Sequence, residues 1–441
     1  MDMIDTSQRV ADFTKMIGNL DLVRQIGRVT DVIGVIIESL GPEAAMGEFC
    51  TIYPRNGSDP IPSEVVGFKG DKLLLMPFGE MHGISPGSEV HASGRPLSVN
   101  ISENIVGRII DGLGNPIDGK GRIVNSEPYP IYAKPPLPLD RKRITEPLPL
   151  GIRAIDGLLT VGKGQRVGIF SGSGVGKSSV MGMIARFTKA DLNVIGLIGE
   201  RGREVREFIE RDLGEEGLAR SIVIVATSDQ SPLMRVKGAY LATTIAEFFR
   251  DRGRDVVLMV DSITRFAYAQ REIGLATGEP PATRGYPPSI FTILPKLLER
   301  SGMSDKGSIT GLYNVLVEAD DMNEPVADIV RSILDGHVVL SRDLAARNIY
   351  PAVDVMQSIS RVMPEITSEE HLQLSRRFVE VMSTYRDSED LINIGAYVKD
   401  SNPKIDFAIS KIDRMNDFIK QGLFEKVEYE DARSSLKGIY N

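Results

Sequence analysis

The stretch SGSGVGKSSV, residues 171–180, decides the fold expected for this chain. It follows the apolar run RVGIF and precedes the helical pattern MGMIARF, so a glycine-rich turn joins a strand to a helix. Glycines in such a turn let backbone N–H groups surround an anion, and the positive end of the following helix points at the same anion. The order strand, glycine-rich turn, lysine and serine is typical of a phosphate-binding loop.

Individual positions of this loop have expected roles. Lys177 supplies a full positive charge for the outer phosphates, and Ser178 offers a hydroxyl to Mg²⁺. Ser171 stands where the strict motif has glycine, but the glycines that approach phosphate remain. A flexible turn without a ligand is the alternative, and the flanking strand and helix argue against it. The expected nucleotide-binding residues are Gly172, Ser173, Gly174, Val175, Gly176, Lys177, Ser178 and Ser179.

Two acidic residues follow other apolar strands. The run DVVLMVDS brings Asp261 to the carboxyl end of a strand, where open parallel sheets bind ligands, so Asp261 is expected to hold Mg²⁺ directly or through water. The segment GERGRE follows the strand NVIGLI and puts Glu200 at the same edge, as a candidate for the carboxylate that activates water. A surface charge is the alternative for Glu200, because the surrounding segment is rich in charges of both signs.

The chain divides into zones with different patterns. In residues 25–100, short apolar runs alternate with Gly/Pro turns and predict a small barrel or sandwich. In residues 101–366, apolar strands alternate with helices and predict a mainly parallel sheet covered on both faces. Residues 367–441 are expected to be helical, and residues 278–289, rich in Pro and Gly, to form an exposed loop. The last zone holds the helix HLQLSRRFVEVMSTY and a second helix with the apolar stripe Ile405, Ile409, Ile412 and Ile419.

Residues 1–24 are expected to contain a short amphipathic helix. Its apolar face would consist of Val10, Phe13, Ile17 and Leu20, which recur at helical spacing. This face either packs on the adjacent barrel or docks a partner, and the sequence leaves both possibilities open.

Composition narrows the function classes. Lys and Arg number 52 against 60 Asp and Glu, and the net charge of −8 argues against a general nucleic-acid binder. Cys50 is the single cysteine, so the chain cannot form an internal disulfide, which fits a reducing compartment. Cys50 itself is expected to be a buried apolar residue. The first residues do not show the basic-then-apolar pattern of a signal peptide, and no apolar run approaches about 18 residues, so a cytoplasmic protein is expected.

Longer segments of the chain resemble the catalytic subunits of rotary-type ATPases. Within that superfamily the resemblance is to the type III secretion branch, which includes the flagellar protein export ATPases. It implies a RecA-like P-loop ATPase core of α/β class, an N-terminal β-barrel and a C-terminal α-helical domain. It also implies a homohexameric ring with ATP and Mg²⁺ at the subunit interfaces. The segments are SGSGVGKS, GERGREVREF, VDSITRFAYAQREIGLATGEPPATRGYPPSIF, VEADDMNEPVAD and DGHVVLSRDLAARNIYPAVDVMQSISR.

The resemblance implies roles for further residues. Arg201 would contact phosphate or the subunit interface, and Tyr350, in NIYPAVD, would stack on adenine. Arg361, in SISR, would be an arginine finger that reaches the γ-phosphate of a neighbour; without the resemblance, a core-edge salt bridge is favoured. Arg300, in KLLER, would contact phosphate. The expected catalytic residues are thus Lys177, Glu200, Arg201 and Arg361.

The resemblance also implies partners and a location. Residues 278–289 would face a central pore, and the C-terminal helices would contact a stalk-like coiled-coil protein. The N-terminal helix would bind a negative regulator. Export chaperones, flagellar substrates and the membrane export gate would be further partners, with no nucleic acid. The protein would be cytoplasmic and peripherally associated with the inner membrane at the flagellar base.

Four alternatives to a flagellar export ATPase are open to comparison. The ATPase of a virulence-type injectisome would carry the same catalytic motifs, although DGLGNPIDGKG and the C-terminal zone favour the flagellar branch. In a proton-translocating ATP synthase, the finger arginine and the catalytic glutamate normally lie on two different chains. A hexameric RNA translocase resembling Rho would need aromatic and basic residues in its barrel, and both are sparse between residues 25 and 100. A noncatalytic ring subunit would typically have Gln in place of Glu200.

Overall fold

The computed structural model describes residues 25–317 and 321–440, which form two compact units divided between Leu97 and Ser98. The amphipathic helix expected in residues 1–24 lies outside the described residues. Across the part of the chain that is described, helices long and apolar enough to cross a bilayer are absent.

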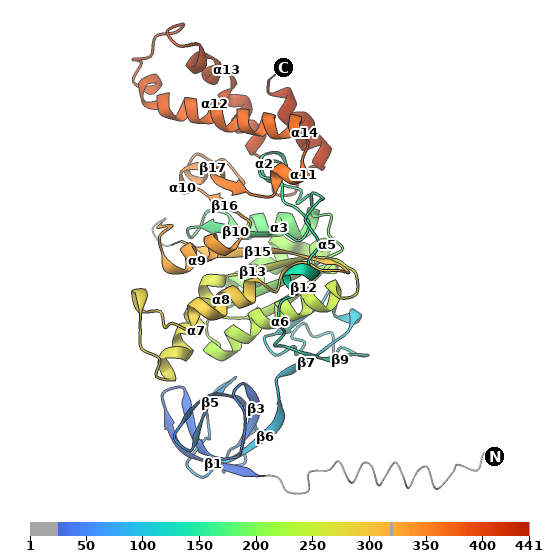
Figure 1. Ribbon diagram of the computed structural model, residues 1–441, viewed down its shortest axis with the longest axis vertical. Coiled ribbons are helices and arrows are strands. Elements are labelled where there is room, and N and C mark those ends of the chain that lie inside the picture. Colours follow the sequence, from blue (N-terminus) through green and yellow to red (C-terminus); the bar gives the residue numbers. More distant parts are fainter. Residues whose placement is uncertain (1–24, 318–320, 441) are drawn as a thin grey trace, which may run out of the picture. The chain divides into compact units, whose positions relative to one another are not determined.

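In the first unit, the described residues form a closed barrel of six antiparallel strands (Figure 1). Strand β1 pairs with both β2 and β6, and this closure decides between the barrel and the sandwich that the sequence allowed. Cys50 is fully buried in the barrel core, as expected, and burial raises the pKa of its thiol to about 12. The strands, in barrel order, are β1 (Ile26–Ile33), β2 (Ile36–Leu40), β5 (Lys72–Pro77), β4 (Ile61–Lys69), β3 (Glu48–Tyr53) and β6 (Glu89–Pro96).

In the described part of the second unit, nine strands form one sheet. Its central strands are parallel, as predicted, and β11 and β12 are buried along their whole length, which explains their continuous apolar sequences. The main path of the sheet runs β17 (Val353–Ser360), β16 (Gly336–Leu340), β10 (Arg166–Ser171), β15 (Ser308–Leu316), β13 (Asp255–Asp261), β11 (Leu192–Ile198), β12 (Ser221–Ala226) and β8 (Ile109–Asp111); the short β14 (Gly302–Met303) pairs antiparallel with β15, and β17 antiparallel with β16. Strands β7 (Ser98–Ile101) and β9 (Glu127–Pro130) form a small separate sheet.

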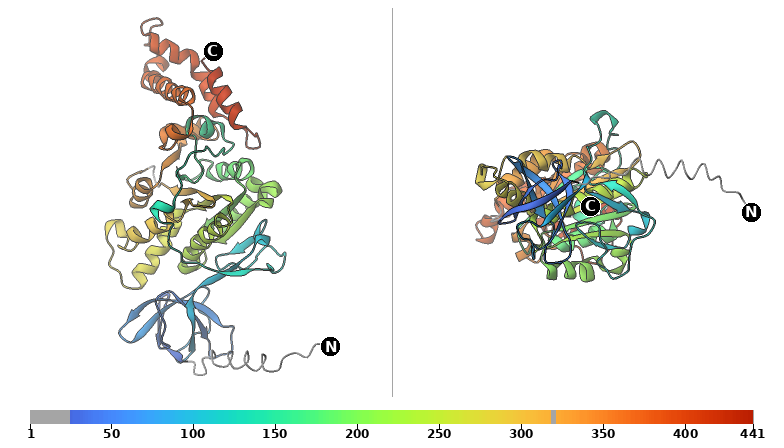
Figure 2. Two further views of the ribbon diagram at one scale, coloured as in Figure 1. Left: turned by 45° about the vertical axis from the view of Figure 1, so that its right-hand side comes forward. Right: turned by 90° about the horizontal axis from the view of Figure 1, so that it is seen from below.

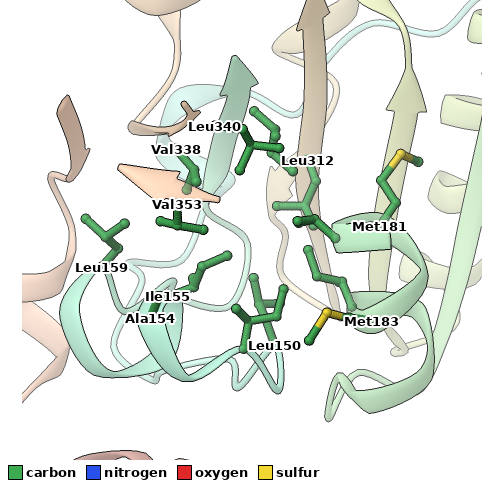
Figure 3. Close-up of a cluster of buried hydrophobic side chains, with 14 of the residues drawn as sticks. Leu150, Ala154, Ile155, Leu159, Met181, Met183, Leu312, Val338, Leu340 and Val353 are labelled. Atoms are coloured by element: carbon green, nitrogen blue, oxygen red, sulfur yellow. The ribbon is translucent and has the colours of Figure 1, made fainter. Parts of the chain in front are cut away.

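Helices cover this sheet on both faces (Figure 1). Figure 3 shows the core on one face, where Met181 and Met183 of α3 and Ile155 of α2 approach Leu312, Val338 and Leu340 on the strands. The helices between the strands are α2 (Arg153–Leu158), α3 (Lys177–Phe187), α4 (Gly202–Glu207), the π-helix η3 (Phe208–Leu213), α5 (Gly214–Ala219), α6 (Pro232–Arg250), α7 (Ile263–Ala276), α8 (Ile290–Leu298), α9 (Pro325–Ile333) and α10 (Arg342–Ala346). Short 3₁₀ turns are η1 (Glu103–Ile105), η2 (Pro138–Asp140) and η4 (Thr283–Gly285), the last within the expected loop 278–289.

The C-terminal residues are helical, as predicted. They form α11 (Met363–Ile366), α12 (Glu369–Asn393), α13 (Pro403–Ile419) and α14 (Tyr429–Gly438), drawn in orange and red in Figures 1 and 2. The hydroxyl of Ser368 accepts from the N–H of His371 at the start of α12, and Asn402 caps α13 in the same way. The predicted stripe of α13 is only partly right, because Ile409 is 37% exposed. The buried residues of α13 are Ala408, Met415, Phe418 and Ile419.

These helices dock on the nucleotide-binding part through a small aromatic core. The rings of Phe378 on α12 and Phe418 on α13 lie 5.7 Å apart. Gly157 of α2 lies against Phe418, since a Cβ at this position would stand 2.8 Å from the ring. The imidazole Nε2 of His371 donates to the Gly157 carbonyl, 2.7 Å away. The C-terminal helices and the sheet are therefore parts of one packed unit.

We expect Phe378→Ala to lower the free energy of unfolding of this unit by about 3–5 kcal/mol, because the side chain is fully buried and its removal leaves a cavity. Urea denaturation followed by circular dichroism measures the change. The matched control is Leu391→Ala on the same helix, where the side chain is 50% exposed and the expected change is below about 0.5 kcal/mol. Equal effects of the two substitutions would contradict the assigned docking core.

Candidate functional site

A cavity of about 710 Å³ opens at the carboxyl edge of the parallel strands. Residues at or just beyond the ends of β10, β11, β13, β15 and β16 contribute to its wall. Ligands of open parallel sheets bind at this edge, because the loops there diverge and leave a crevice. The cavity is therefore the candidate site for the phosphates predicted from residues 171–180.

The glycine-rich loop lines this cavity and runs directly into α3. Gly174 and Gly176 have φ angles of 81° and 90°, a left-handed conformation that side chains disfavour. At Gly172, a Cβ would stand 2.6 Å from the guanidinium of Arg342, so a larger residue there would require this side chain to shift. Of the expected loop residues, Gly172, Ser173, Gly174, Gly176, Lys177, Ser178 and Ser179 line the cavity, while Val175 is buried.

Lys177 lies between two carboxylates. Its Nζ is 2.6 Å from Oδ1 of Asp261 and 3.3 Å from Oε1 of Glu200. The three side chains are only 13%, 5% and 14% exposed, so these charges are largely removed from water. Burial alone would lower the pKa of Lys177, but the two carboxylates outweigh it, and its pKa lies above the ordinary value. Burial raises the pKa of Asp261, against the opposing effect of the Lys177 charge.

The groups around the cavity fit a nucleoside triphosphate with Mg²⁺. Ser178, the second residue of α3, lines the cavity together with the carboxylates. The buried hydroxyl of Ser171 lines it too and has no hydrogen-bond partner among the described residues, as a group that meets a ligand would. Gly174 borders open space, with no atom within 4 Å of a Cβ built there. Hydroxyl and carboxylate oxygens suit Mg²⁺, and lysine and arginine suit phosphate.

Three of the four residues whose roles come from the resemblance, Arg201, Tyr350 and Arg361, lie at different places. Arg201 lines the cavity beside Glu200, and its guanidinium pairs with Glu204 at 3.3 Å. Tyr350 is 41% exposed, and its ring lies 3.5 Å from where a Cβ would stand on Gly176. Arg361 is exposed, directly follows the edge strand β17, and is not among the residues that line the cavity.

Arg300 is not brought to the cavity. Its side chain is 2% exposed and pairs with both carboxylate oxygens of Glu247, at 2.9 and 2.5 Å. It also donates to the Ile131 carbonyl and to the hydroxyl of Thr244. This network ties the end of α8 to α6. The structure therefore does not support the expected phosphate contact of Arg300, because its guanidinium is already engaged in the core.

Sequence reasoning missed other cationic and aromatic residues of the cavity wall. Arg265 and Tyr268 lie on α7, one and two turns after Asp261, and Arg342 begins α10 just after β16. Arg265 could have been found from its spacing, since a residue four positions after a strand-end aspartate lies in the first turn of the next helix. Arg342 follows the parallel strand β16 as directly as Glu200 follows β11. These arginines add positive charge to a site suited to polyphosphate.

Comparisons with known proteins agree with this geometry. The family model for the nucleotide-binding domain of the ATP synthase alpha/beta family matches residues 151–360, and that for its beta-barrel domain matches residues 29–94. The model for the T3SS EscN ATPase C-terminal domain matches residues 367–438. The flagellum-specific ATP synthase of Bacillus subtilis (strain 168) is 55% identical over 95% of this chain and 96% of its own length. The chain belongs to the flagellar and type III secretion ATPases.

Flagellar and type III secretion members of this family both resemble the chain over nearly its whole length. The type 3 secretion system ATPase of Xanthomonas euvesicatoria is 50% identical over 96% of both chains. The assembled ATPase EscN of the enteropathogenic E. coli type III secretion system matches with a TM-score of 0.88 and 43% identity, covering 94% of this chain and all of EscN. The chain is accordingly an ATP-hydrolysing enzyme with the RecA-like core, N-terminal barrel and C-terminal helices that the sequence predicted.

We expect Lys177→Ala to weaken binding of ATP by about 30-fold or more, because it removes the buried cation from the phosphate site. Equilibrium binding of a fluorescent ATP analogue measures the loss. Lys189→Ala is the matched control, since this lysine is 50% exposed and pairs with Glu428 at the surface. Wild-type affinity in Lys177→Ala would mean that the phosphates bind elsewhere.

Proposed function

We propose that this chain is the Mg-ATP-hydrolysing motor of a flagellar type III protein export apparatus and works as a homohexamer. One observation carries the proposal. The candidate catalytic carboxylate, Glu200, lies inside the cavity with Lys177, whereas Arg361 of the same chain is exposed at the edge of the sheet. A chain with this arrangement can be catalytic at one surface and supply an arginine at another, as a ring of identical subunits requires.

The cavity residues account for hydrolysis as follows. Lys177 and the cationic residues of the wall bind and orient the phosphates, and Ser178 and Asp261 would hold Mg²⁺. Bound Mg²⁺ neutralises charge on the phosphate oxygens. Glu200 then positions and deprotonates the attacking water, because its carboxylate stands at the edge of the phosphate site. Arg201 beside it supports the carboxylate or the transferred phosphate.

Two residues outside the immediate phosphate site complete the proposed mechanism. Tyr350 would stack on adenine, which its half-exposed ring next to Gly176 allows. Arg361 would reach the γ-phosphate bound by a neighbouring subunit and stabilise charge that develops in the transition state. Its exposure supports this role in trans over a salt bridge within the chain, and it makes hydrolysis depend on assembly.

The partners that we propose include those seen in solved assemblies of a relative. EscN has been solved as an assembled ATPase and in a complex with its central stalk EscO, which supports a ring around a stalk-like protein. We include export chaperones, flagellar substrates, a negative regulator at the N-terminal residues and the membrane export gate, at a cytoplasmic site peripheral to the inner membrane. The injectisome ATPase is the second candidate, supported by the relative from Xanthomonas.

Glu200→Gln is expected to lower the rate of ATP hydrolysis at least about 100-fold, because the amide cannot accept a proton from water. Binding of ATP should remain, since the substitution keeps the size of the side chain. Phosphate release and analogue binding are measured on the same preparation. Glu210→Gln, on an exposed residue paired with Arg206, is the control and should keep full activity. Retained hydrolysis in Glu200→Gln would remove Glu200 from its role.

Arg361→Ala is expected to lose hydrolysis about 10³-fold or more and to keep nucleotide binding by the isolated subunit. Mixing inactive Arg361→Ala subunits with inactive Glu200→Gln subunits should restore part of the activity, because some interfaces then pair an intact Glu200 with an intact Arg361. Specific activity of the wild type should rise with protein concentration. A mixture that stays inactive, while each variant still assembles, would refute the contribution in trans. Arg376→Ala on the exposed surface of α12 is the control.

A further inference from the structure

Gln421 is a buried residue in the segment between α13 and α14, which meets the nucleotide-binding part of the second unit at several points. The Leu423 carbonyl also accepts from Arg186, and Glu428 pairs with Lys189.

The side chain of Gln421 is 6% exposed. Its amide nitrogen donates to the carbonyls of Gly151 and Glu425, each at 2.8 Å, and its amide oxygen accepts from the N–H of Arg153 at 2.7 Å. Its backbone N–H donates to the carbonyl of Tyr350 at 2.9 Å.

These bonds fix Gln421 in one orientation. Both amide hydrogens and the amide oxygen have partners, so turning the amide over would break all three bonds at once. Arg153 reinforces the position, because its guanidinium donates to the carbonyls of Asp417 and Lys420 at the end of α13 and pairs with Glu425. The backbone of residue 421 is thereby held against Gly151 and Arg153, next to α2.

The position of Tyr350 depends on its hydrogen bond with Gln421 more than the position of a fully buried residue would. Its ring is 41% exposed and borders Gly176 of the glycine-rich loop, while its carbonyl accepts from Gln421. Because Tyr350 is partly exposed, packing restrains its ring less than it restrains a buried ring, and the position of its backbone matters correspondingly more. The bond from Gln421 is a tertiary restraint on that backbone from a segment about 70 residues further along the chain.

We propose that Gln421 is a positioning residue that sets the place of the Tyr350 ring beside the phosphate loop, and so sets the affinity for the base of the nucleotide. This inference rests on the proposed stacking of Tyr350 on adenine. Gln421 contacts neither base nor phosphate in this scheme and acts through Tyr350 alone. By thermodynamic linkage, a bound base also stabilises the seating of the segment between α13 and α14.

The test compares a ligand with a base and one without. Gln421→Met keeps the volume of the side chain but loses its three hydrogen bonds. Gln421→Ala loses the hydrogen bonds and most of the side-chain volume. Circular dichroism and thermal unfolding verify that each variant folds. We expect Gln421→Met to weaken binding of N-methylanthraniloyl-ATP about tenfold and to leave binding of inorganic triphosphate unchanged. The KM for ATP should rise about tenfold, with a smaller change in kcat. Gln373→Ala, on an exposed glutamine of α12 bonded to Glu369, is the control.

Each outcome decides the question. Equal weakening of the ATP analogue and triphosphate by Gln421→Met would overturn the proposal, because Gln421 would then support the phosphate loop or the fold. Unchanged binding of both ligands would overturn it too. Tyr350→Ala separates the two hypotheses: if it leaves ATP affinity unchanged, adenine stacking fails and this inference with it. If Tyr350→Ala weakens ATP binding and the Gln421 variants do not, only the role of Gln421 fails.

A double-mutant cycle tests the route of the effect. If Gln421 acts through Tyr350, adding Gln421→Met to Tyr350→Ala should weaken ATP binding no further than Tyr350→Ala does alone. Additive effects would mean two independent contributions to binding and would overturn the positioning role.

Discussion

The site depends on one buried ion cluster, in which Lys177 stands between Asp261 and Glu200. A lysine this deeply buried is tolerated because two carboxylates share its charge; removing them would leave a strongly destabilising cation. The cluster requires the ends of three strands to converge. Strand β10 carries the loop before Lys177, β13 ends in Asp261, and β11 leads to Glu200. The order β10, β15, β13, β11 in the sheet is what makes these ends meet.

Together with nearby arginines, this cluster determines which charges the cavity presents to a polyphosphate. Two protein carboxylates hold the Lys177 ammonium group in the cavity wall. Arg201, Arg265 and Arg342 line the same wall and add positive charge. Charges that are held in place before a ligand binds stabilise a transition state more effectively than mobile ones. Glycine at residue 172 leaves room for the observed close approach of the Arg342 guanidinium to the loop.

Under the proposed stacking of Tyr350 on adenine, the C-terminal helices connect this arrangement to the base of the nucleotide. Their aromatic core packs Phe378 and Phe418 against α2, and the segment that follows α13 holds the carbonyl of Tyr350. If Gln421 positions Tyr350 as proposed, helices that pack on the sheet influence nucleotide affinity without touching the ligand. Arg361 is exposed and does not line the cavity of its own chain. The proposed function assigns this arginine to the site of a neighbouring subunit, so that hydrolysis would depend on assembly.

The sequence by itself determined the architecture and the phosphate site. Residues 171–180 predict their strand, loop and helix from local patterns alone, and strand-end acidic residues predict one sheet edge, because carboxyl ends of parallel strands share that edge. Apolar runs and turn residues likewise predicted the parallel sheet, but in residues 25–100 they allowed either a barrel or a sandwich, and the pairing of β1 with β6 decided for the barrel. Tertiary structure decided what local patterns do not encode: that Arg300 pairs with Glu247 in the core, that Arg342 and Arg265 reach the cavity, and that Gln421 meets Tyr350. These contacts join residues far apart in the chain, and their partners follow from packing, which periodicity and spacing do not specify.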